Sequence, residues 1–449
     1  MRKLFGTDGI RAVAGESPLD RKTLFAVGIA LAHHVGAEGT QPRVILGMDT
    51  RESSEWIAAI ITAGLRKGGA TVESAGVITT PAIAYLTRSH GFSAGIVISA
   101  SHNPWQDNGI KVFGPDGYKL PDATELAIED EIFSQLARDH ADHTEDLPVP
   151  AVEEADRAEY VRSLLTAVDG LSLDGKRIVI DCANGAASAV APQLFAGLGG
   201  EVRIRNASPN GRNINEGCGA LHPEVVASYV LEDKADLGIT FDGDADRALF
   251  ADENGKVVNG DAVMLLAARD LQERGLLHDN TVVATTMSNM GLEAALKRSG
   301  IRMLRAPVGD KYVLQQMQEK KASLGGEQSG HILFTGRSTT GDGLLTALLL
   351  LDIVHRSGES LGELTSDLKT FPQVIVNVKV REKKPLESIP SVAARIAEAD
   401  AALADSGRVV IRYSGTEALA RVMIEAEDEA AMRLHADAIA NAIRAELGI

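Results

Sequence analysis

The chain is short of cysteine, of net positive charge and of long apolar segments. Its two cysteines, Cys182 and Cys218, have no metal-binding spacing, so we expect reduced thiols and a cytoplasmic location. The net charge of −17 argues against nucleic acid or an anionic membrane as a partner. The apolar run at residues 344–354 is too short to span a bilayer and predicts a buried helix. The first residues lack the apolar segment of a signal peptide.

The rest of the composition is that of a folded, multidomain protein. Of its 449 residues, 45% are hydrophobic and 24% are charged, as in ordinary globular proteins. Such a length exceeds one core and predicts about three or four domains. Apolar strands alternate with helical segments, which is typical of a mostly parallel sheet. We predict an α/β fold of three successive mixed-sheet domains plus a smaller α+β C-terminal domain, with boundaries at residues 1–152, 153–253, 254–368 and 369–449.

One buried strand delivers a serine to its end. Residues 95–104, GIVISASHNP, begin with β-branched apolar residues and stop at an Asn-Pro turn signal. Ser101 therefore lies at the carboxyl end of a strand, where α/β sheets bind ligands. A serine there can act as a nucleophile or carry a phosphoryl group. Taken alone, the stretch favours a plainer interpretation, a serine that caps a strand-to-helix turn.

A second strand delivers a cluster of carboxylates. Asp242, Asp244 and Asp246 stand at alternate positions of one loop, and hard oxygen ligands at this density suit Mg²⁺ or Ca²⁺. An EF-hand is the rival, because Glu253 falls at its twelfth ligand position. However, Arg247 occupies the sixth position, where an EF-hand requires glycine, and the flanking segments are typical of strands. We therefore favour a magnesium loop of another kind.

A phosphoryl group on Ser101 would connect the serine to these aspartates. Three carboxylates leave Mg²⁺ short of its octahedral set, and a phosphate oxygen is its habitual further ligand. Moving a phosphoryl group also needs a proton carrier, for which Lys111, Arg11 and His331 are candidates. A lone histidine is more often structural than catalytic, and the sequence does not rank the three.

Two further loops carry groups suited to a sugar phosphate. Hydroxyls, backbone N–H groups and guanidinium charges could form a phosphate cradle near the C-terminus. Its members are Arg412, Ser414, Gly415 and Thr416, with Arg421 shortly after them. The loop at residues 325–331, GGEQSGH, offers Glu327 and Ser329 to sugar hydroxyls. The alternative for both loops is a plain polar hairpin turn.

Taken together, these loops resemble the α-D-phosphohexomutase family. The motifs GTDGIR, SASHNP, DGDADR, GGEQSGH and RYSGTE appear in the family's order over essentially the whole chain. The resemblance implies four domains around a central cleft, with Ser101 phosphorylated in the active enzyme. It also implies Mg²⁺ held by Asp242, Asp244, Asp246 and the phosphate on Ser101.

The same resemblance implies roles for the other residues. Arg247 would support the metal loop and contact phosphate, and Glu327 and Ser329 would recognise the sugar. The non-reacting phosphate would be bound by Arg412, Ser414, Gly415, Thr416 and, as an added guanidinium, Arg421. Lys111, Arg11 and His331 match cleft positions of the family, but the resemblance does not decide which is base and which is acid.

The implied reaction is an isomerisation of a hexose phosphate through a 1,6-bisphosphate. Gln328 and the opening GTDGIR indicate the aminosugar branch, so the implied substrates are the 6- and 1-phosphates of glucosamine, with glucosamine 1,6-bisphosphate as intermediate. Such an enzyme would supply UDP-N-acetylglucosamine and form homodimers. The alternatives are a glucose or mannose phosphate branch of the family and a non-catalytic sugar-phosphate sensor.

Overall fold

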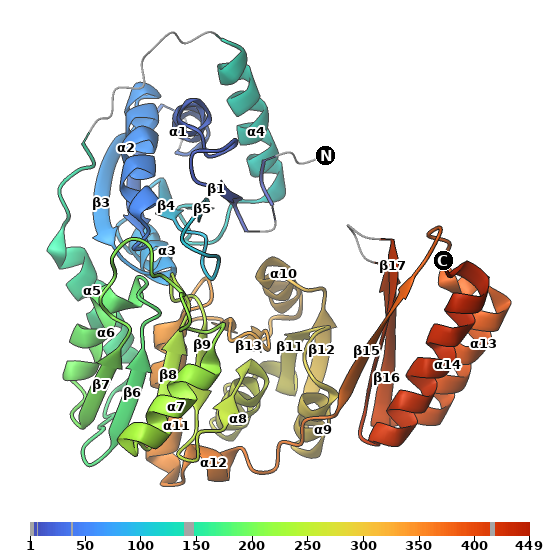
Figure 1. Ribbon diagram of the computed structural model, residues 1–449. Helices are drawn as coiled ribbons and strands as arrows, with labels where there is room; N and C mark the ends of the chain where they lie inside the picture. Colours follow the sequence, from blue (N-terminus) through green and yellow to red (C-terminus); the bar gives the residue numbers. More distant parts are fainter. Residues whose placement is uncertain (1–3, 7, 37–38, 139–147, 414–417) are drawn as a thin grey trace. The chain divides into compact units, whose positions relative to one another are not determined.

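The computed structural model describes residues 4–6, 8–36, 39–138, 148–413 and 418–449. The chain forms two compact units, the first from residues 1–287 and 301–366 and the second from residues 288–300 and 367–449. The first unit contains three sheets and the second contains one (Figure 1). Among the described residues, no helix is both long and apolar enough to cross a membrane.

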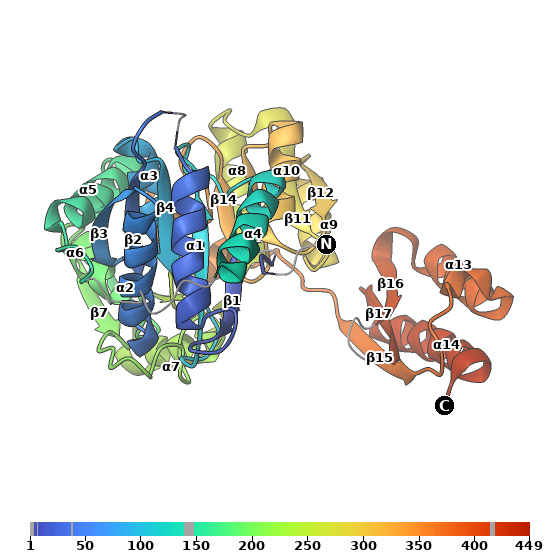
Figure 2. The same cartoon turned by 90° about the horizontal axis from the view of Figure 1, so that it is seen from above.

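The first sheet has the strand order β1-β5-β4-β2-β3. Its strands are β1 (Ile10–Val13), β2 (Arg43–Met48), β3 (Thr71–Val77), β4 (Ala94–Ile98) and β5 (Asp107–Phe113). Its helices are α1 (Arg21–His34), α2 (Glu52–Lys67), α3 (Thr80–Ser89) and α4 (Asp122–Ala137). Alternate residues of β2 and β4 join the apolar core under α1, α2 and α4, and α3 packs on the opposite face (Figure 2). β4 is therefore buried on both faces, as its apolar sequence predicts.

The second sheet has the order β10-β9-β8-β6-β7. Its strands are β6 (Arg177–Asp181), β7 (Glu201–Arg205), β8 (Leu237–Phe241), β9 (Ala248–Ala251) and β10 (Val257–Val258). Its helices are α5 (Glu154–Leu165), α6 (Ala187–Ala196) and α7 (Pro223–Asp233). α5 begins inside the acidic stretch where the sequence predicts the end of the first domain.

The third sheet has the order β12-β11-β13-β14. Its strands are β11 (Thr281–Thr285), β12 (Arg302–Ala306), β13 (Leu324–Gly326) and β14 (Ile332–Phe334). Its helices are α8 (Gly260–Glu273), α10 (Asp310–Lys320), α11 (Gly343–Ser357) and the short α12 (Leu361–Leu364). Asn259 and Asp342 cap α8 and α11 by accepting hydrogen bonds from their first backbone N–H groups. α11 contains the apolar run near residue 350 and is buried, as the sequence predicts.

The three sheets of the first unit share one topology. In each, three parallel strands are followed by an antiparallel strand, which gives the orders β3-β2-β4-β5, β7-β6-β8-β9 and β12-β11-β13-β14. The connection from the third parallel strand to the antiparallel strand is the serine loop (residues 99–106), the aspartate loop (residues 242–247) or the sugar loop (residues 327–331). One repeated architecture thus places all three motifs at equivalent positions.

Close backbone contacts hold the aspartate loop against the serine loop and the sugar loop against β9. A Cβ atom at Gly243 would lie 2.4 Å from the Ser101 carbonyl oxygen, so the aspartate loop can approach the serine loop only with glycine there. Gly330 has a φ of +94°, and a Cβ atom there would lie 2.4 Å from the Ala248 carbonyl oxygen. The Ala248 N–H donates to the Gly330 carbonyl over 3.1 Å, which ties the sugar loop to β9.

The second unit is an α+β layer. Its antiparallel sheet has the order β15-β17-β16. Its elements are α9 (Met290–Arg298), β15 (Gln373–Lys379), α13 (Pro390–Leu403), β16 (Gly407–Tyr413), β17 (Leu419–Ala426) and α14 (Glu429–Leu447). Apolar residues of α13 and α14 form one core with alternate residues of the strands, so these helices cover one face of the sheet.

Candidate active site

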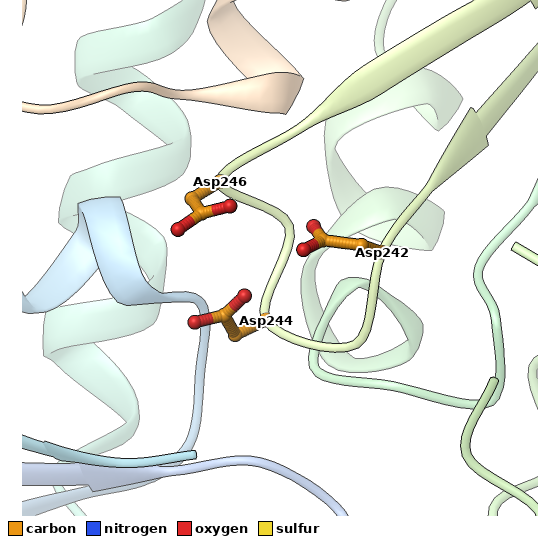
Figure 3. A group of neighbouring side chains, drawn as sticks. All are labelled: Asp242, Asp244 and Asp246. Atoms are coloured by element: carbon orange, nitrogen blue, oxygen red, sulfur yellow. The ribbon is translucent and has the colours of Figure 1, made fainter. Parts of the chain in front are cut away.

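The aspartate loop holds three buried carboxylates at the end of β8. One carboxylate oxygen from each of Asp242, Asp244 and Asp246 lies within 4.8 Å of the others, and the side chains converge (Figure 3). The Ser101 hydroxyl donates to Asp242 Oδ2 over 2.5 Å. The Lys111 ammonium lies 2.9 Å from Asp244 Oδ2 and 3.0 Å from Asp246 Oδ2. Residues from the first two sheets therefore meet in one cluster.

Burial and charge decide the protonation of this cluster. Burial, followed by repulsion from Asp246 and Asp244, raises the pKa of Asp242 to about 8. Burial alone would raise the pKa of Asp246 too, but the positive charges of Lys111 and His331 hold that pKa well below its ordinary value. Burial would lower the pKa of Lys111, yet the neighbouring carboxylates raise it well above its ordinary value. Asp242 is thus the carboxyl that holds a proton at pH 7.

The donor set fits a hard divalent cation. Three carboxylates within reach of one ion match the oxygen ligands that Mg²⁺ and Ca²⁺ select. Asp244 Oδ1 is buried and makes no hydrogen bond, which leaves it available to a cation. The EF-hand alternative is wrong, since the loop joins β8 to β9 and Glu253 binds the start of α12 through Ser360. The aspartate loop is a candidate metal site of another kind.

The serine loop has a strained and firmly held backbone. Ser101 has a left-handed φ of +53°, which a non-glycine residue adopts only when its surroundings impose it. Its carbonyl oxygen accepts from Asn215 Nδ2 over 2.9 Å and from Arg51 Nη2 over 3.2 Å, and its N–H donates to Ser99 Oγ over 2.9 Å. The loop leads into β5 rather than a helix, so the capping interpretation of Ser101 is wrong.

His102 completes the surroundings of the serine hydroxyl. Its Nδ1 lies 3.2 Å from Ser101 Oγ. Burial, followed by the positive charges of Arg247 and Arg11, lowers the pKa of His102 to about 4. The imidazole is therefore neutral at pH 7 and can exchange a hydrogen bond with Ser101 without adding charge.

The sugar loop presents polar groups beside the aspartate loop. Glu327 is half-buried and accepts from the Gly309 N–H over 3.1 Å through Oε1, and Ser329 is exposed. The Ser329 hydroxyl lies 3.5 Å from Glu327 Oε2. Gln328 donates from Nε2 to Asp261 Oδ2 over 3.3 Å. This loop therefore offers a carboxylate, a hydroxyl and an amide from one hairpin.

His331 is buried between two carboxylates. Its Nδ1 lies 3.6 Å from Asp246 Oδ1 and its Nε2 lies 3.7 Å from Asp310 Oδ2. The Gly341 N–H donates to Nε2 over 3.2 Å, which favours the neutral tautomer with its proton on Nδ1. Burial alone would lower the pKa of His331, but Asp246 and Asp310 raise it above its ordinary value. The raised pKa favours a proton on His331, which makes the imidazole a candidate proton carrier.

Some of these groups line one cavity in the first unit. Its volume is about 350 Å³, within the range of small-molecule sites. The polar side chains that line it are Asp8, Arg11, His102, Asp246, Arg247, Asp310, Glu327 and His331. The cavity brings together residues of all three sheets.

Comparisons with known proteins agree over the whole chain. The phosphoglucomutase/phosphomannomutase models match residues 2–139 (alpha/beta/alpha domain I), 158–255 (domain II), 259–371 (domain III) and 375–442 (C-terminal domain). A phosphoglucosamine mutase of Koribacter versatilis is 58% identical over 100% of this chain and 98% of its own. One of Solibacter usitatus is 52% identical over 100% and 99%. The chain belongs to the phosphoglucomutase/phosphomannomutase family of α-D-phosphohexomutases.

Solved structures of phosphohexomutases have the same fold. A family protein from Burkholderia thailandensis superposes with a TM-score of 0.79 at 24% identity, covering 99% of both chains. The N-acetylphosphoglucosamine mutase of Aspergillus fumigatus, in complex with GlcNAc-6P and magnesium, gives a TM-score of 0.63 at 20% identity and covers 99% of this chain and 96% of its own. The three α/β sheets and the α+β C-terminal layer predicted from the sequence are confirmed.

In this phosphohexomutase, part of the expected phosphate cradle lies in the second unit. Arg412 of β16 is the cross-strand partner of Arg421 of β17. Paired residues of an antiparallel ladder point to one face, so the two side chains start from the same side of the sheet. Like charges in such a pair repel, and a bound anion would relieve the repulsion. Ser414, Gly415 and Thr416 lie outside the described residues.

The sequence alone missed several members of the site. Neither Asp8, in the GTDGIR turn, nor Asp310, the first residue of α10, was assigned a role. His102 and Lys119 were not singled out, and Thr80, whose hydroxyl donates to Asp244 Oδ2 over 2.5 Å, looked like an ordinary helix start. The one available signal was adjacency, since His102 follows Ser101 directly.

Proposed function

We propose that the protein interconverts glucosamine 6-phosphate and glucosamine 1-phosphate through a phosphoserine at Ser101. The observation that carries this proposal is the buried Ser101 hydroxyl, 2.5 Å from Asp242 in a three-carboxylate cluster beside Lys111. Relatives that are 58% and 52% identical over the full chain, both phosphoglucosamine mutases, support the choice of substrate.

In the first half-reaction, phosphorylated Ser101 gives its phosphoryl group to O1 of glucosamine 6-phosphate. The bond from phosphorus to Ser101 Oγ breaks and a bond from phosphorus to O1 forms. The proton of the O1 hydroxyl passes to a base, and Ser101 Oγ regains a proton. His331, whose pKa is raised by Asp246 and Asp310, is suited to exchanging this proton. Lys111 is charged and suited to stabilising the transferring group.

In the second half-reaction, the resulting 1,6-bisphosphate turns around in the cleft. The bond from O6 to its phosphorus breaks as Ser101 Oγ attacks that phosphorus. O6 gains a proton, Ser101 Oγ loses one, and the phosphoserine is restored. One set of binding groups therefore serves both orientations of glucosamine 1,6-bisphosphate.

We further propose that the cation is Mg²⁺, held by Asp242, Asp244, Asp246 and an oxygen of the Ser101 phosphate. When bound, it supplies positive charge that stabilises the transferring phosphoryl group. Lys111 contacts Asp244 and Asp246 and keeps both oriented, and its charge lowers the pKa of Asp246.

Binding of Mg²⁺ to the unphosphorylated protein is expected to release about one proton at pH 7, because a metal ligand must be deprotonated. Asp242, with a pKa of about 8, is mostly protonated in the free protein at that pH. Since its pKa is raised, affinity should increase as pH rises toward 8, by about tenfold per unit, and then level off. Calorimetric titration in two buffers of different ionisation enthalpy measures the proton count. Metal binding without proton release at pH 7 would contradict the assignment.

The remaining binding groups follow from the same proposal. Glu327 and Ser329 bind sugar hydroxyls, and Arg247 supports the aspartate loop and contacts phosphate. The non-reacting phosphate is bound by Arg412, Ser414, Gly415, Thr416 and Arg421. Arg11 lines the cleft as a further cation. The proposal includes four domains, at residues 1–152, 153–253, 254–368 and 369–449. It also includes a homodimer in the cytoplasm. The product would be used in the synthesis of UDP-N-acetylglucosamine.

Substrate choice tests the proposal. With Mg²⁺ and a priming bisphosphate, kcat/KM for glucosamine 6-phosphate is expected to exceed that for glucose 6-phosphate by about 100-fold or more. The Gln328 amide oxygen would accept a hydrogen bond from the 2-amino group, while Nε2 stays on Asp261. Gln328→Met should therefore reduce this preference about tenfold.

A matched control is Gln315→Met, since Gln315 of α10 is exposed and donates from Nε2 to its neighbour Glu319 over 3.1 Å. Its preference should equal that of the unmodified protein. A preference for glucose 6-phosphate would assign the protein to the glucose or mannose branch of the family. Absence of turnover with either substrate, in protein whose Ser101 is phosphorylated, would leave only a sugar-phosphate sensor.

A further inference from the structure

We infer that Lys119 is a positioning residue that fixes both candidate proton carriers, Lys111 and His331, by closing a ring of side chains around the cleft. Lys119 lies 2.5 Å from Asp8 Oδ1, and Lys111 lies 3.1 Å from Asp8 Oδ2. The two oxygens of one carboxylate therefore join the two lysines. The inference rests on the proposed function, because it concerns the placement of groups that this reaction needs.

The other side of Lys119 leads to the histidine. The Lys119 ammonium pairs with Asp310 Oδ2, and the same oxygen lies 3.7 Å from His331 Nε2. Asp310 is the first residue of α10 in the third sheet, whereas Lys119 follows β5 in the first. Lys119 thus joins two parts of the first unit through the carboxylate that faces His331.

Asp246 closes the ring on the far side. Its Oδ2 lies 3.0 Å from Lys111 and its Oδ1 lies 3.6 Å from His331 Nδ1. Carboxylates and nitrogen groups therefore alternate around the ring. Its members, in order, are Lys111, Asp8, Lys119, Asp310, His331 and Asp246. Asp8 also pairs with Arg11, and Lys111 also contacts Asp244, whereas Lys119 is the cation that joins Asp8 to Asp310.

The ring is mostly buried, and the turn that carries Lys119 is held by a hydrogen bond. The Lys119 side chain is 16% exposed, and its carboxylate partners Asp8 and Asp310 are 21% and 17% exposed. The turn before Lys119 is held by a hydrogen bond of 2.6 Å from the Thr339 hydroxyl to the Gly117 carbonyl. Partly desolvated ion pairs of this kind have defined geometry, since an unpaired charge there would be costly.

Loss of Lys119 should therefore affect chemistry more than binding. Asp310 would lose its ammonium partner and Asp8 would keep only Arg11 and Lys111, so both carboxylates should shift and displace His331 and Lys111. A displacement of about 1 Å in a reacting group can reduce the rate of a chemical step 100-fold. The groups proposed to bind sugar and the non-reacting phosphate are not members of the ring, so KM should change little.

The test compares Lys119→Met and Lys119→Arg with the matched control Lys311→Met. Lys311 also bridges the first and third sheets, because it pairs with Asp122 and lies 3.7 Å from Glu125, both on α4. Its ammonium pairs with α4, so this control separates the bracing of the two sheets from the positioning of Lys111 and His331. Lys119 borders a second cavity of about 1000 Å³, which gives arginine room to fit.

Steady-state assays with glucosamine 6-phosphate, and single-turnover transfer from phosphorylated Ser101 to the sugar, provide the readouts. Lys119→Met is expected to lower kcat and the transfer rate by about 10- to 100-fold, with KM within about threefold of the unmodified protein. Lys119→Arg should recover at least about a third of the lost rate, since it restores both ion pairs. Lys311→Met should leave the transfer rate within about twofold.

The outcomes are separable. If the unmodified, phosphorylated protein does not turn over glucosamine 6-phosphate, the proposed function fails rather than the role of Lys119. If it does, an unchanged rate in Lys119→Met, or an equal loss in Lys311→Met, overturns the inference. Should Lys119→Met not fold, Asp310→Asn decides in its place: a tenfold lower transfer rate with unchanged KM supports the ring, and an unchanged rate overturns it.

Discussion

Replacement of Ser101 by alanine is expected to lower turnover by at least about 10⁴-fold, because the covalent route loses the atom that carries the phosphoryl group. The fold should survive, since the hydroxyl bonds Asp242 and lies within hydrogen-bond distance of His102, and each interaction is worth about 1 kcal/mol. Steady-state assay together with the intact mass of the protein after incubation with a bisphosphate measures both activity and phosphorylation.

Ser99→Ala is the matched control for this change. Ser99 is buried in the same loop and accepts the Ser101 N–H over 2.9 Å, but its hydroxyl has no place in the transfer. Its loss should loosen the loop and lower turnover by no more than about tenfold, as for one neutral hydrogen bond. Substantial activity in Ser101→Ala, or a phosphorylated Ser101→Ala protein, would remove the phosphoserine mechanism.

The second large effect is expected from Asp242→Asn, which should lower turnover about 10³-fold and weaken Mg²⁺ binding at least tenfold. The substitution keeps the size of the side chain that contacts Ser101 and removes the charge that a cation needs. It also removes the group with the raised pKa, so the proton released on metal binding should disappear.

Asp252→Asn is the matched control, because it tests whether neutralising another buried aspartate of the same sheet also lowers turnover and metal affinity. Asp252 is buried at the turn between β9 and β10, where Oδ1 accepts from the N–H groups of Asn254 and Lys256 over 2.9 and 2.8 Å. An asparagine oxygen can accept the same hydrogen bonds, so metal affinity and turnover should stay near those of the unmodified protein. If Asp242→Asn binds Mg²⁺ normally, the aspartate loop is not the metal site.

Short motifs made much of the site accessible from sequence. Ser101, Asp242, Asp244 and Asp246 each stand at the end of an apolar strand, and strand ends are where such sheets place ligands. The polar helix α10 was missed, since few apolar residues mark its buried face.

Contacts between segments that are distant in the chain could not be predicted from short motifs. Asn215 supports the Ser101 carbonyl across 114 residues, and Lys119 reaches Asp310 across 191 residues. A single buried asparagine or lysine has no periodicity and no local motif, so its partner is defined only when the sheets pack together. The left-handed backbone at Ser101 is likewise imposed by its neighbours rather than by serine itself.

The sequence by itself determined the fold class, the order of the functional loops and the residue types that could bind a cation and a sugar phosphate. Those features depend on local patterns, namely apolar strands, turn signals and short motifs. Only the tertiary structure decided that Ser101, Lys111 and the aspartates form one buried cluster, and that Lys119 joins the first sheet to the third. Burial and charge act over ångströms in space rather than along the chain, which is why the pKa values of Asp242 and His102 and the closed ring appear only in the folded protein.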